Sequence, residues 1–345
     1  MALKKFTPAL SDCQTATSIQ HDSSAKTLIR LARCHMSLGQ GNQAHLALSK
    51  ILQQNANAAS SSSATGSSFT AAEKDSAKQL DSQVKRMVDA LETYTKSRLE
   101  KKWTMASIAL DRAIQEIGGS NDSTEGVPYS WRVSKAELCL RKGQLEMSNS
   151  LVTDLLRSDS SQPEALILRC QILMSKGEIA KAIQHAQAAL RSDPDSKLAR
   201  RLMKKCKLLD SIKTKGNEAF KSAQYAEAVQ TYTAAITEAD ADSEDPEMIE
   251  LKGFKATLFS NRATAKSKLA DYEGTVSDCD EALQLDAGYV KALRTRARAF
   301  SQLEKYEEAV RDFKEAMEES GETDASLQNE LRQAEIDLKR SKKKE

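Results

Sequence analysis

The chain has 345 residues, of which 40% are hydrophobic and 29% are charged, and its formal net charge is +2. This near-neutral balance argues against bulk attraction to nucleic acid or to a membrane surface. No stretch approaches the roughly 20 apolar residues that span a bilayer, and the amino terminus lacks the apolar core of a signal peptide. We therefore expect neither nucleic acid nor a membrane as a partner.

The six cysteines are widely spaced and form no Cys-x-x-Cys pair. This pattern favours small buried packing residues in a reducing compartment over a metal site or a disulfide framework. The four histidines are isolated, and the chain has no glycine-rich phosphate loop, zinc-protease motif or nucleophile elbow. We expect a protein of the cytosol or nucleus that has no catalytic activity, metal or cofactor.

Small residues recur at a fixed spacing. An Ala, Gly or Cys, or Tyr in one looser copy, is followed 12 residues later by Ala or Thr and 19 residues later by Ala. The copies are Tyr94/Ala106/Ala113, Cys170/Ala182/Ala189, Gly216/Ala228/Ala235, Ala263/Thr275/Ala282 and Ala297/Ala309/Ala316. Small residues at these offsets let two antiparallel helices approach closely, one pair per roughly 34 residues, which resembles a tetratricopeptide array. The prediction is an all-α tetratricopeptide-repeat superhelix, an α-solenoid whose groove is lined by the first helix of each pair.

The predicted elements begin with a truncated block of helix pairs at 1–52. Residues 3–13 align with residues 269–279, the second half of a later repeat, so the first helix of that pair is missing. We expect Met1 to be an internal methionine of a longer natural protein, and a natural half-repeat acting as a cap is the alternative. The Ser- and Ala-rich stretch at 53–71 predicts a flexible linker.

Two further blocks follow the linker. A central block at 72–208 is expected to hold three helix pairs, and a carboxyl-terminal block at 209–320 is expected to hold pairs at 209–240, 250–286 and 290–320.

The segment 321–345 predicts a capping helix with a basic end. Its apolar residues share one side and are suited to cover the last pair: Ala325, Leu327, Leu331, Ala334 and Leu338. We interpret the terminal run Lys-Arg-Ser-Lys-Lys-Lys as a solvated helix end that the helix dipole favours. A nuclear-localisation or phosphate-binding tract is the alternative.

Candidate binding residues lie on the first helices of the carboxyl-terminal block. Lys213 and Asn217 are four residues apart and therefore share one helix face. The next two first helices carry Asn261 and Lys291. Two ammonium groups and two carboxamides are thus offered to one groove, which matches a ligand with two carboxylates.

These four residues resemble the two-carboxylate clamp of tetratricopeptide co-chaperones, which holds the Glu-Glu-Val-Asp carboxyl terminus of the seventy- and ninety-kilodalton heat-shock chaperones. The resemblance also implies an arginine four residues after Lys291, where this chain has Thr295 between Arg294 and Arg296. Because adjacent helix residues are turned by about 100°, neither arginine simply replaces the missing one. We expect Arg294, Arg296 and Lys268 to act as auxiliary cations.

The same resemblance places a remnant of a second clamp near the amino terminus. Lys26 and Arg30 have the four-residue spacing of the last two clamp positions, and their partners would lie on helices before Met1. Plain surface charge is the alternative for this pair.

The chain as a whole resembles the tetratricopeptide region of J-domain co-chaperones. In that family a basic helix end leads into a J domain, whose His-Pro-Asp motif stimulates the ATPase of the seventy-kilodalton chaperone, and no His-Pro-Asp occurs here. The resemblance therefore implies the peptide-binding portion alone, about one and a half repeats short at the front. It implies the two heat-shock chaperone classes as partners, and we expect a monomer.

Two functions remain open at this point. The first is a co-chaperone adaptor that binds chaperone tails, assists folding and transfers clients. The second is a general scaffold that binds internal peptides of a partner that is not a chaperone. A requirement for a free terminal carboxylate distinguishes them, because only the first ligand ends in one.

Overall fold

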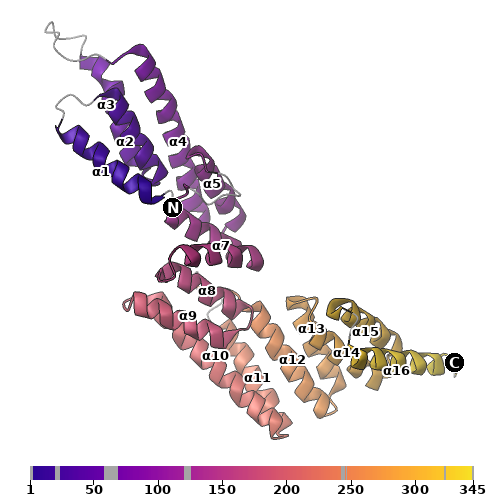
Figure 1. Ribbon diagram of the computed structural model, residues 1–345. Helices are drawn as coiled ribbons and strands as arrows, with labels where there is room; N and C mark the ends of the chain where they lie inside the picture. The colour runs from indigo at the N-terminus through magenta and orange to yellow at the C-terminus, as the bar shows by residue number, and fades with distance from the viewer. Residues whose placement is uncertain are drawn as a thin grey trace. The chain divides into compact units, whose positions relative to one another are not determined.

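The described residues of this computed structural model are 3–19, 24–57, 69–119, 126–241, 245, 247–321 and 324–343. They form sixteen α-helices and no strand, which confirms the predicted all-α fold (Figure 1). The chain divides into two compact units, Met1–Ser158 and Asp159–Glu345. We call them unit 1 and unit 2 and describe each by itself.

Unit 1 is a row of helices in which each packs on the next along the chain, and α2 also contacts α4. The helices are α1 (Leu3–Ile19), α2 (Ala25–Ser37), α3 (Gly41–Asn57), α4 (Ala71–Leu99), α5 (Trp103–Glu116), α6 (Tyr129–Arg141) and α7 (Leu145–Ser158). Of the linker expected at 53–71, residues 58–68 lie outside the described part of the chain.

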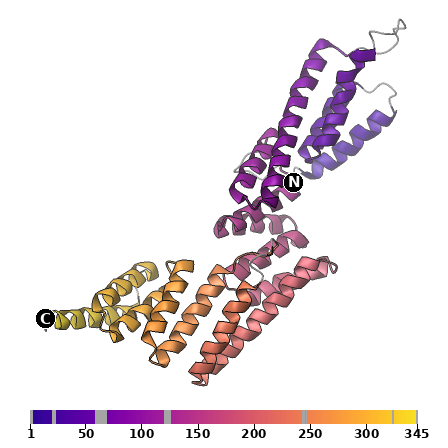
Figure 2. The same cartoon turned by 180° about the vertical axis from the view of Figure 1, so that it is seen from behind.

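Unit 2 repeats this arrangement with nine helices in its described residues, seen from both sides in Figures 1 and 2. They are α8 (Pro163–Ser175), α9 (Ile179–Ser192), α10 (Lys197–Lys221), α11 (Tyr225–Asp240), α12 (Lys252–Lys268), α13 (Tyr272–Leu285), α14 (Val290–Gln302), α15 (Tyr306–Ser320) and α16 (Ala325–Ser341). Among the first helices of the pairs, α8 contacts α10 and α12, and α12 contacts α14. The candidate residues therefore lie on helices of one packed group, in which α12 contacts α14 directly and α10 and α12 share α8 and α11 as neighbours.

The small residues of the repeat are buried where paired helices meet, as the spacing predicts. Two further copies exist in unit 1, at Ala32/Ala44 and Ala136/Ser148. The predicted pattern leaves them out because it has Ala at the third position, where they carry Ile51 and Leu155, and Ala or Thr at the second, where one carries Ser148. The Ser148 hydroxyl donates to the Ala136 carbonyl oxygen at 2.8 Å, a contact that only a close helix approach permits.

The expected block boundary between residues 208 and 209 lies inside α10, a single helix of 25 residues. No break in the backbone separates the central block from the carboxyl-terminal block, and the three-block division is still a prediction. Residues 242–244 and 246 of the acidic loop lie outside the described residues. The part that follows is tied to α8, because Gln171 and Ser175 donate to the carbonyl oxygens of Glu247 and Glu250 at 2.8 Å and 3.1 Å.

One ion pair repeats in the last two helix pairs. Arg262 on α12 contacts Asp278 on α13 at 2.7 Å, and Arg296 on α14 contacts Asp312 on α15 at 2.6 Å. Both carboxylates are almost fully buried, so each needs its arginine as a partner. These arginines join the first helix of a pair to the second.

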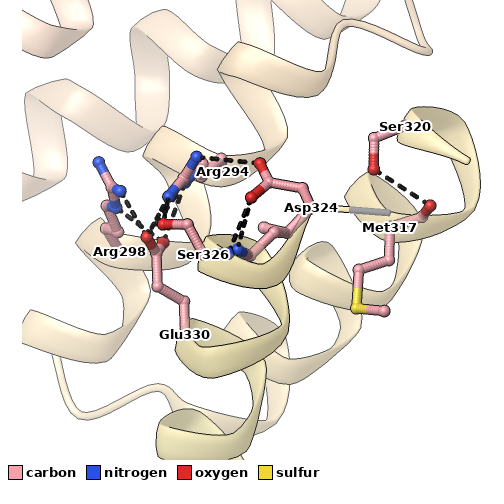
Figure 3. A network of polar contacts seen from close by, with 8 residues as sticks. Arg294, Arg298, Met317, Ser320, Asp324, Ser326 and Glu330 are labelled. Carbon is pink, nitrogen blue, oxygen red and sulfur yellow. Dashed lines mark hydrogen bonds and ion pairs between the residues drawn. The ribbon is translucent and has the colours of Figure 1, made fainter. Parts of the chain in front are cut away.

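The capping helix α16 is attached to α14 by a polar network (Figure 3). Arg294 and Arg298 both point toward Glu330 and form ion pairs with it, and Arg294 also donates to the Ser326 hydroxyl at 2.6 Å. Asp324 caps the start of α16 by accepting from the backbone N–H groups of Ser326 and Leu327. Leu327 and Ala334 are buried in one apolar cluster with residues of α14 and α15, Leu331 and Leu338 are partly buried against it, and Ala325 is exposed.

No helix among the described residues has the length and apolar content required to cross a bilayer. Within the same residues, no three His, Cys, Asp or Glu side chains gather in a way that would hold a metal ion.

Candidate functional site

A cavity of about 240 Å³ lies between four helices of unit 2. Residues from α10, α11, α12 and α14 line it: Asn217, Phe220, Lys221, Tyr232, Asn261, Thr264 and Lys291. Three of the four predicted clamp residues are therefore brought together around one space. The fourth, Lys213, lies one turn before Asn217 on the same face of α10.

A glycine sets the geometry of the α10 wall. The ring of Tyr232 on α11 lies so close to Gly216 that a Cβ there would come within 2.7 Å of Cε1. This close approach lets the Tyr232 hydroxyl donate to Asn217 Oδ1 at 2.8 Å. Because Oδ1 accepts that bond, the amide N–H groups of Asn217 are left to face a ligand as donors.

The α12 and α14 walls meet through a second polar contact. Lys291 Nζ donates to Asn261 Oδ1 at 2.6 Å, which joins the amide of α12 to the ammonium of α14. The bond orients the Asn261 side chain, and the Lys291 ammonium keeps further N–H groups for other acceptors.

The surroundings of both predicted lysines, Lys213 and Lys291, lower their pKa values. Burial lowers the pKa of Lys213, an effect that Asp210 partly offsets, and the Lys213 ammonium lies over the Phe254 ring at 5.6 Å. Lys291 is exposed by surface area, yet the protein atoms around it displace enough water to lower its pKa, and the charge of Lys213 lowers it further. Neither lysine forms an ion pair with any described residue.

The arginines beside Thr295 have other partners. Arg294 is paired with Glu330 on α16, and Arg296 contacts Asp312 and also Asp280, at 2.6 Å each. Neither lines the cavity, so the structure gives the two arginines a role in holding helices together and we do not propose them again as auxiliary cations. The divergence follows from their positions, because residues on either side of Thr295 are turned away from its face in opposite directions.

Thr295 lies half-buried one turn after Lys291, and its hydroxyl donates to the Lys291 carbonyl oxygen at 2.7 Å. Lys268 is exposed at the end of α12 and does not line the cavity. Lys26 and Arg30 are both exposed on α2, and their role as a clamp remnant is still a prediction.

Sequence reasoning missed four of the lining residues: Phe220, Lys221, Tyr232 and Thr264. Lys221 had an available signal, because it follows Asn217 by four residues and therefore shares its face. Tyr232 belongs to a second helix, and only the close approach at Gly216 brings it to the groove.

Comparison with known proteins agrees with this architecture. Residues 132–197 match the tetratricopeptide repeat family. A DnaJ homolog subfamily C member 7 homolog of Schizosaccharomyces pombe is 34% identical over 264 residues, which cover 76% of this chain and 53% of that protein. The human DnaJ homolog subfamily C member 7 is 28% identical over 293 residues, or 85% of this chain and 52% of that protein.

The fold also matches a solved structure. The tetratricopeptide domain of P58(IPK) superposes with a TM-score of 0.64 over 99% of this chain and 86% of that one, at 19% identity. The chain spans about half the length of the DnaJ homologs it matches. The helices of the chain thus have the tetratricopeptide-repeat fold, and over most of its length the sequence is similar to the DnaJ homolog subfamily C member 7 proteins.

Proposed function

We propose that unit 2 binds the carboxyl-terminal peptides of the seventy- and ninety-kilodalton heat-shock chaperones and that the protein is a co-chaperone adaptor. The observation that carries this proposal is the pair of lysines Lys213 and Lys291. Lys291 lines the cavity with Asn217 and Asn261, Lys213 lies one turn before Asn217 and its charge acts on Lys291, and neither lysine forms an ion pair with a described residue.

The physical reason is electrostatic. The charge of Lys213 lowers the pKa of Lys291, so the two ammonium groups lie close enough to repel, and an anion between them would relieve that repulsion. A peptide that ends in Asp brings two carboxylates, one from the main chain and one from the side chain. Such a ligand relieves the repulsion and forms charge-assisted hydrogen bonds, while the amide N–H groups of Asn217 and Asn261 supply neutral donors.

The similarity to the DnaJ homologs supports the same assignment, because the resemblance to J-domain co-chaperones implies the seventy-kilodalton chaperone as a partner. We propose from this that the adaptor assists folding by transferring clients between chaperones, in the cytosol.

A titration of the full chain tests the proposal. The probe is a peptide ending in Glu-Glu-Val-Asp, and the variants are Lys213→Ala and Lys291→Ala. Each removes one charged donor, so binding should weaken by about 1.5–3 kcal/mol, or roughly 10- to 150-fold. Lys215→Ala is the matched control, because Lys215 is an exposed lysine of α10 outside the cavity lining. If both variants bind within about 0.5 kcal/mol of the parent, the proposed site is wrong and a scaffold that binds internal peptides elsewhere is favoured.

A further inference from the structure

A third lysine, Lys221, lines the cavity and has no part in the predicted clamp. Lys213, Asn217 and Lys221 follow one another at intervals of four residues on α10. They form a ladder on one helix face, with Lys213 and Lys221 separated along the axis by about 12 Å. The two ammonium groups therefore bracket the Asn217 amide, one turn to either side.

The cations of this region fall into two groups. The arginines Arg262, Arg294, Arg296 and Arg298 are all paired with carboxylates of neighbouring helices. By contrast, Lys221 forms no ion pair with a described residue, as is true of Lys213 and Lys291. Among the cations that line the cavity or lie next to it on α10, the three lysines are thus without an ion pair to a described residue.

Lys221 lines the cavity together with two hydroxyls whose protons are already donated within the protein. A hydroxyl has one proton to donate. The Thr264 hydroxyl donates it to the Ser260 carbonyl oxygen at 2.8 Å, and the Tyr232 hydroxyl donates it to Asn217 at 2.8 Å. A carboxylate placed between Thr264 and Tyr232 would therefore find its donor in the exposed Lys221 ammonium.

We infer that Lys221 extends the site from two carboxylates to three and selects peptides with an acidic side chain upstream of the terminal residue. This inference rests on the proposed function. An extended peptide rises about 3.3 Å per residue, so an acidic residue two or three positions before the end lies roughly 7–10 Å from it. That distance is within reach of the Lys221 ammonium when the terminal residue is held between Lys213 and Lys291. Lys221 thus supplies a third charge to a site in which position 295 carries threonine in place of the arginine that the resemblance implies.

The test uses the full chain and two peptides with free carboxyl termini, one ending in Glu-Glu-Val-Asp and one ending in Gln-Gln-Val-Asp. The parent protein should prefer the first by about 10-fold or more, as a charged hydrogen bond would give. In Lys221→Gln the preference should fall to about threefold or less. The affinity for the Glu-Glu-Val-Asp peptide should drop, whereas the affinity for the Gln-Gln-Val-Asp peptide should stay at the parent value.

Two further variants complete the design. Lys221→Arg keeps the charge and should retain most of the preference, whereas Lys215→Gln removes an exposed charge of the same helix outside the cavity and should retain all of it. Thermal melting of each variant shows that the fold is unchanged.

The outcomes separate this inference from the proposed function. If the parent binds neither peptide, both fall. If the parent binds but Lys221→Gln keeps the same preference, or loses affinity equally for both peptides, the clamp stands and the assignment of Lys221 is wrong.

Discussion

Replacing Arg296 with Ala should destabilise unit 2, because the structure makes this residue part of the core. Its side chain is 19% exposed, and its guanidinium contacts Asp312, whose side chain is 1% exposed. Burial opposes the charge of Arg296, but the hydrogen bonds to Asp312 and Asp280 outweigh that penalty and raise its pKa. Removal of the arginine leaves the Asp312 carboxylate buried without a partner.

The expected cost is about 3–5 kcal/mol, the range for breaking one partner out of a buried pair. For a unit of this size, 1 kcal/mol shifts the melting temperature by roughly 2–4 °C, so the transition of unit 2 should fall by about 6–20 °C. Arg298→Ala is the matched control, because its side chain is 55% exposed and its ion pair with Glu330 should contribute at most about 1 kcal/mol.

Circular dichroism during heating measures the effect. Both tryptophans, Trp103 and Trp131, belong to unit 1, so tryptophan fluorescence reports that unit separately. The double variant Arg296→Met with Asp312→Leu should recover most of the lost stability, since it removes both charges. A melting temperature for Arg296→Ala within about 2 °C of the parent, or equal to that of Arg298→Ala, would refute the structural role.

Two further predictions concern Thr295 and the capping helix. Thr295→Arg restores a cation one turn after Lys291 on the same face, and it should strengthen binding of the Glu-Glu-Val-Asp peptide by about 10-fold in a calorimetric titration; unchanged or weaker affinity would show that this face does not reach the ligand. Burial alone raises the pKa of Glu330, but Arg298 and Arg294 outweigh it and lower the pKa to about 2 from an ordinary 4.5. A carboxyl group whose pKa is lower in the folded state than in the unfolded state stabilises the fold fully above its unfolded-state pKa, and this contribution is lost as the pH falls toward its folded-state pKa. The free energy of unfolding of unit 2 should therefore decrease between about pH 4.5 and 2. Urea unfolding should show that part of the pH dependence disappear in Glu330→Gln, and an identical pH profile would contradict the ion-pair attachment of α16.

The fold was predictable because the close packing of its helix pairs requires small residues at constant spacings along the sequence. A small residue such as Ala recurs where the helices of a pair cross, and Ala263 and Ala297 are both fully buried there. The copies at Ala32/Ala44 and Ala136/Ser148 depart from that pattern because their third positions, Ile51 and Leu155, are large, and because Ser148 stands where the pattern has Ala or Thr. The crossing tolerates a large side chain there, and only the structure shows it buried.

The candidate site was predictable only in part. Four residues follow from helical spacing and resemblance, and the structure places three of them around one cavity with the fourth beside it. Spacing cannot tell an arginine that faces a ligand from one that faces a carboxylate 16 or 36 residues away, which is the case for Arg296 with Asp312 and Arg294 with Glu330. Distant partners depend on how helices pack, and that information is not local in the sequence.

We propose that unit 2 holds a free terminal carboxylate, and a paired titration tests this binding most directly. The full chain is titrated with one Glu-Glu-Val-Asp peptide in two forms, with its terminal carboxylate free and with it amidated. Amidation removes one negative charge and its charge-assisted hydrogen bonds without changing any side chain, so the account predicts a loss of at least 10-fold in affinity. Equal affinity for the two forms would contradict it, because a site that does not sense the terminal charge is not a carboxylate clamp.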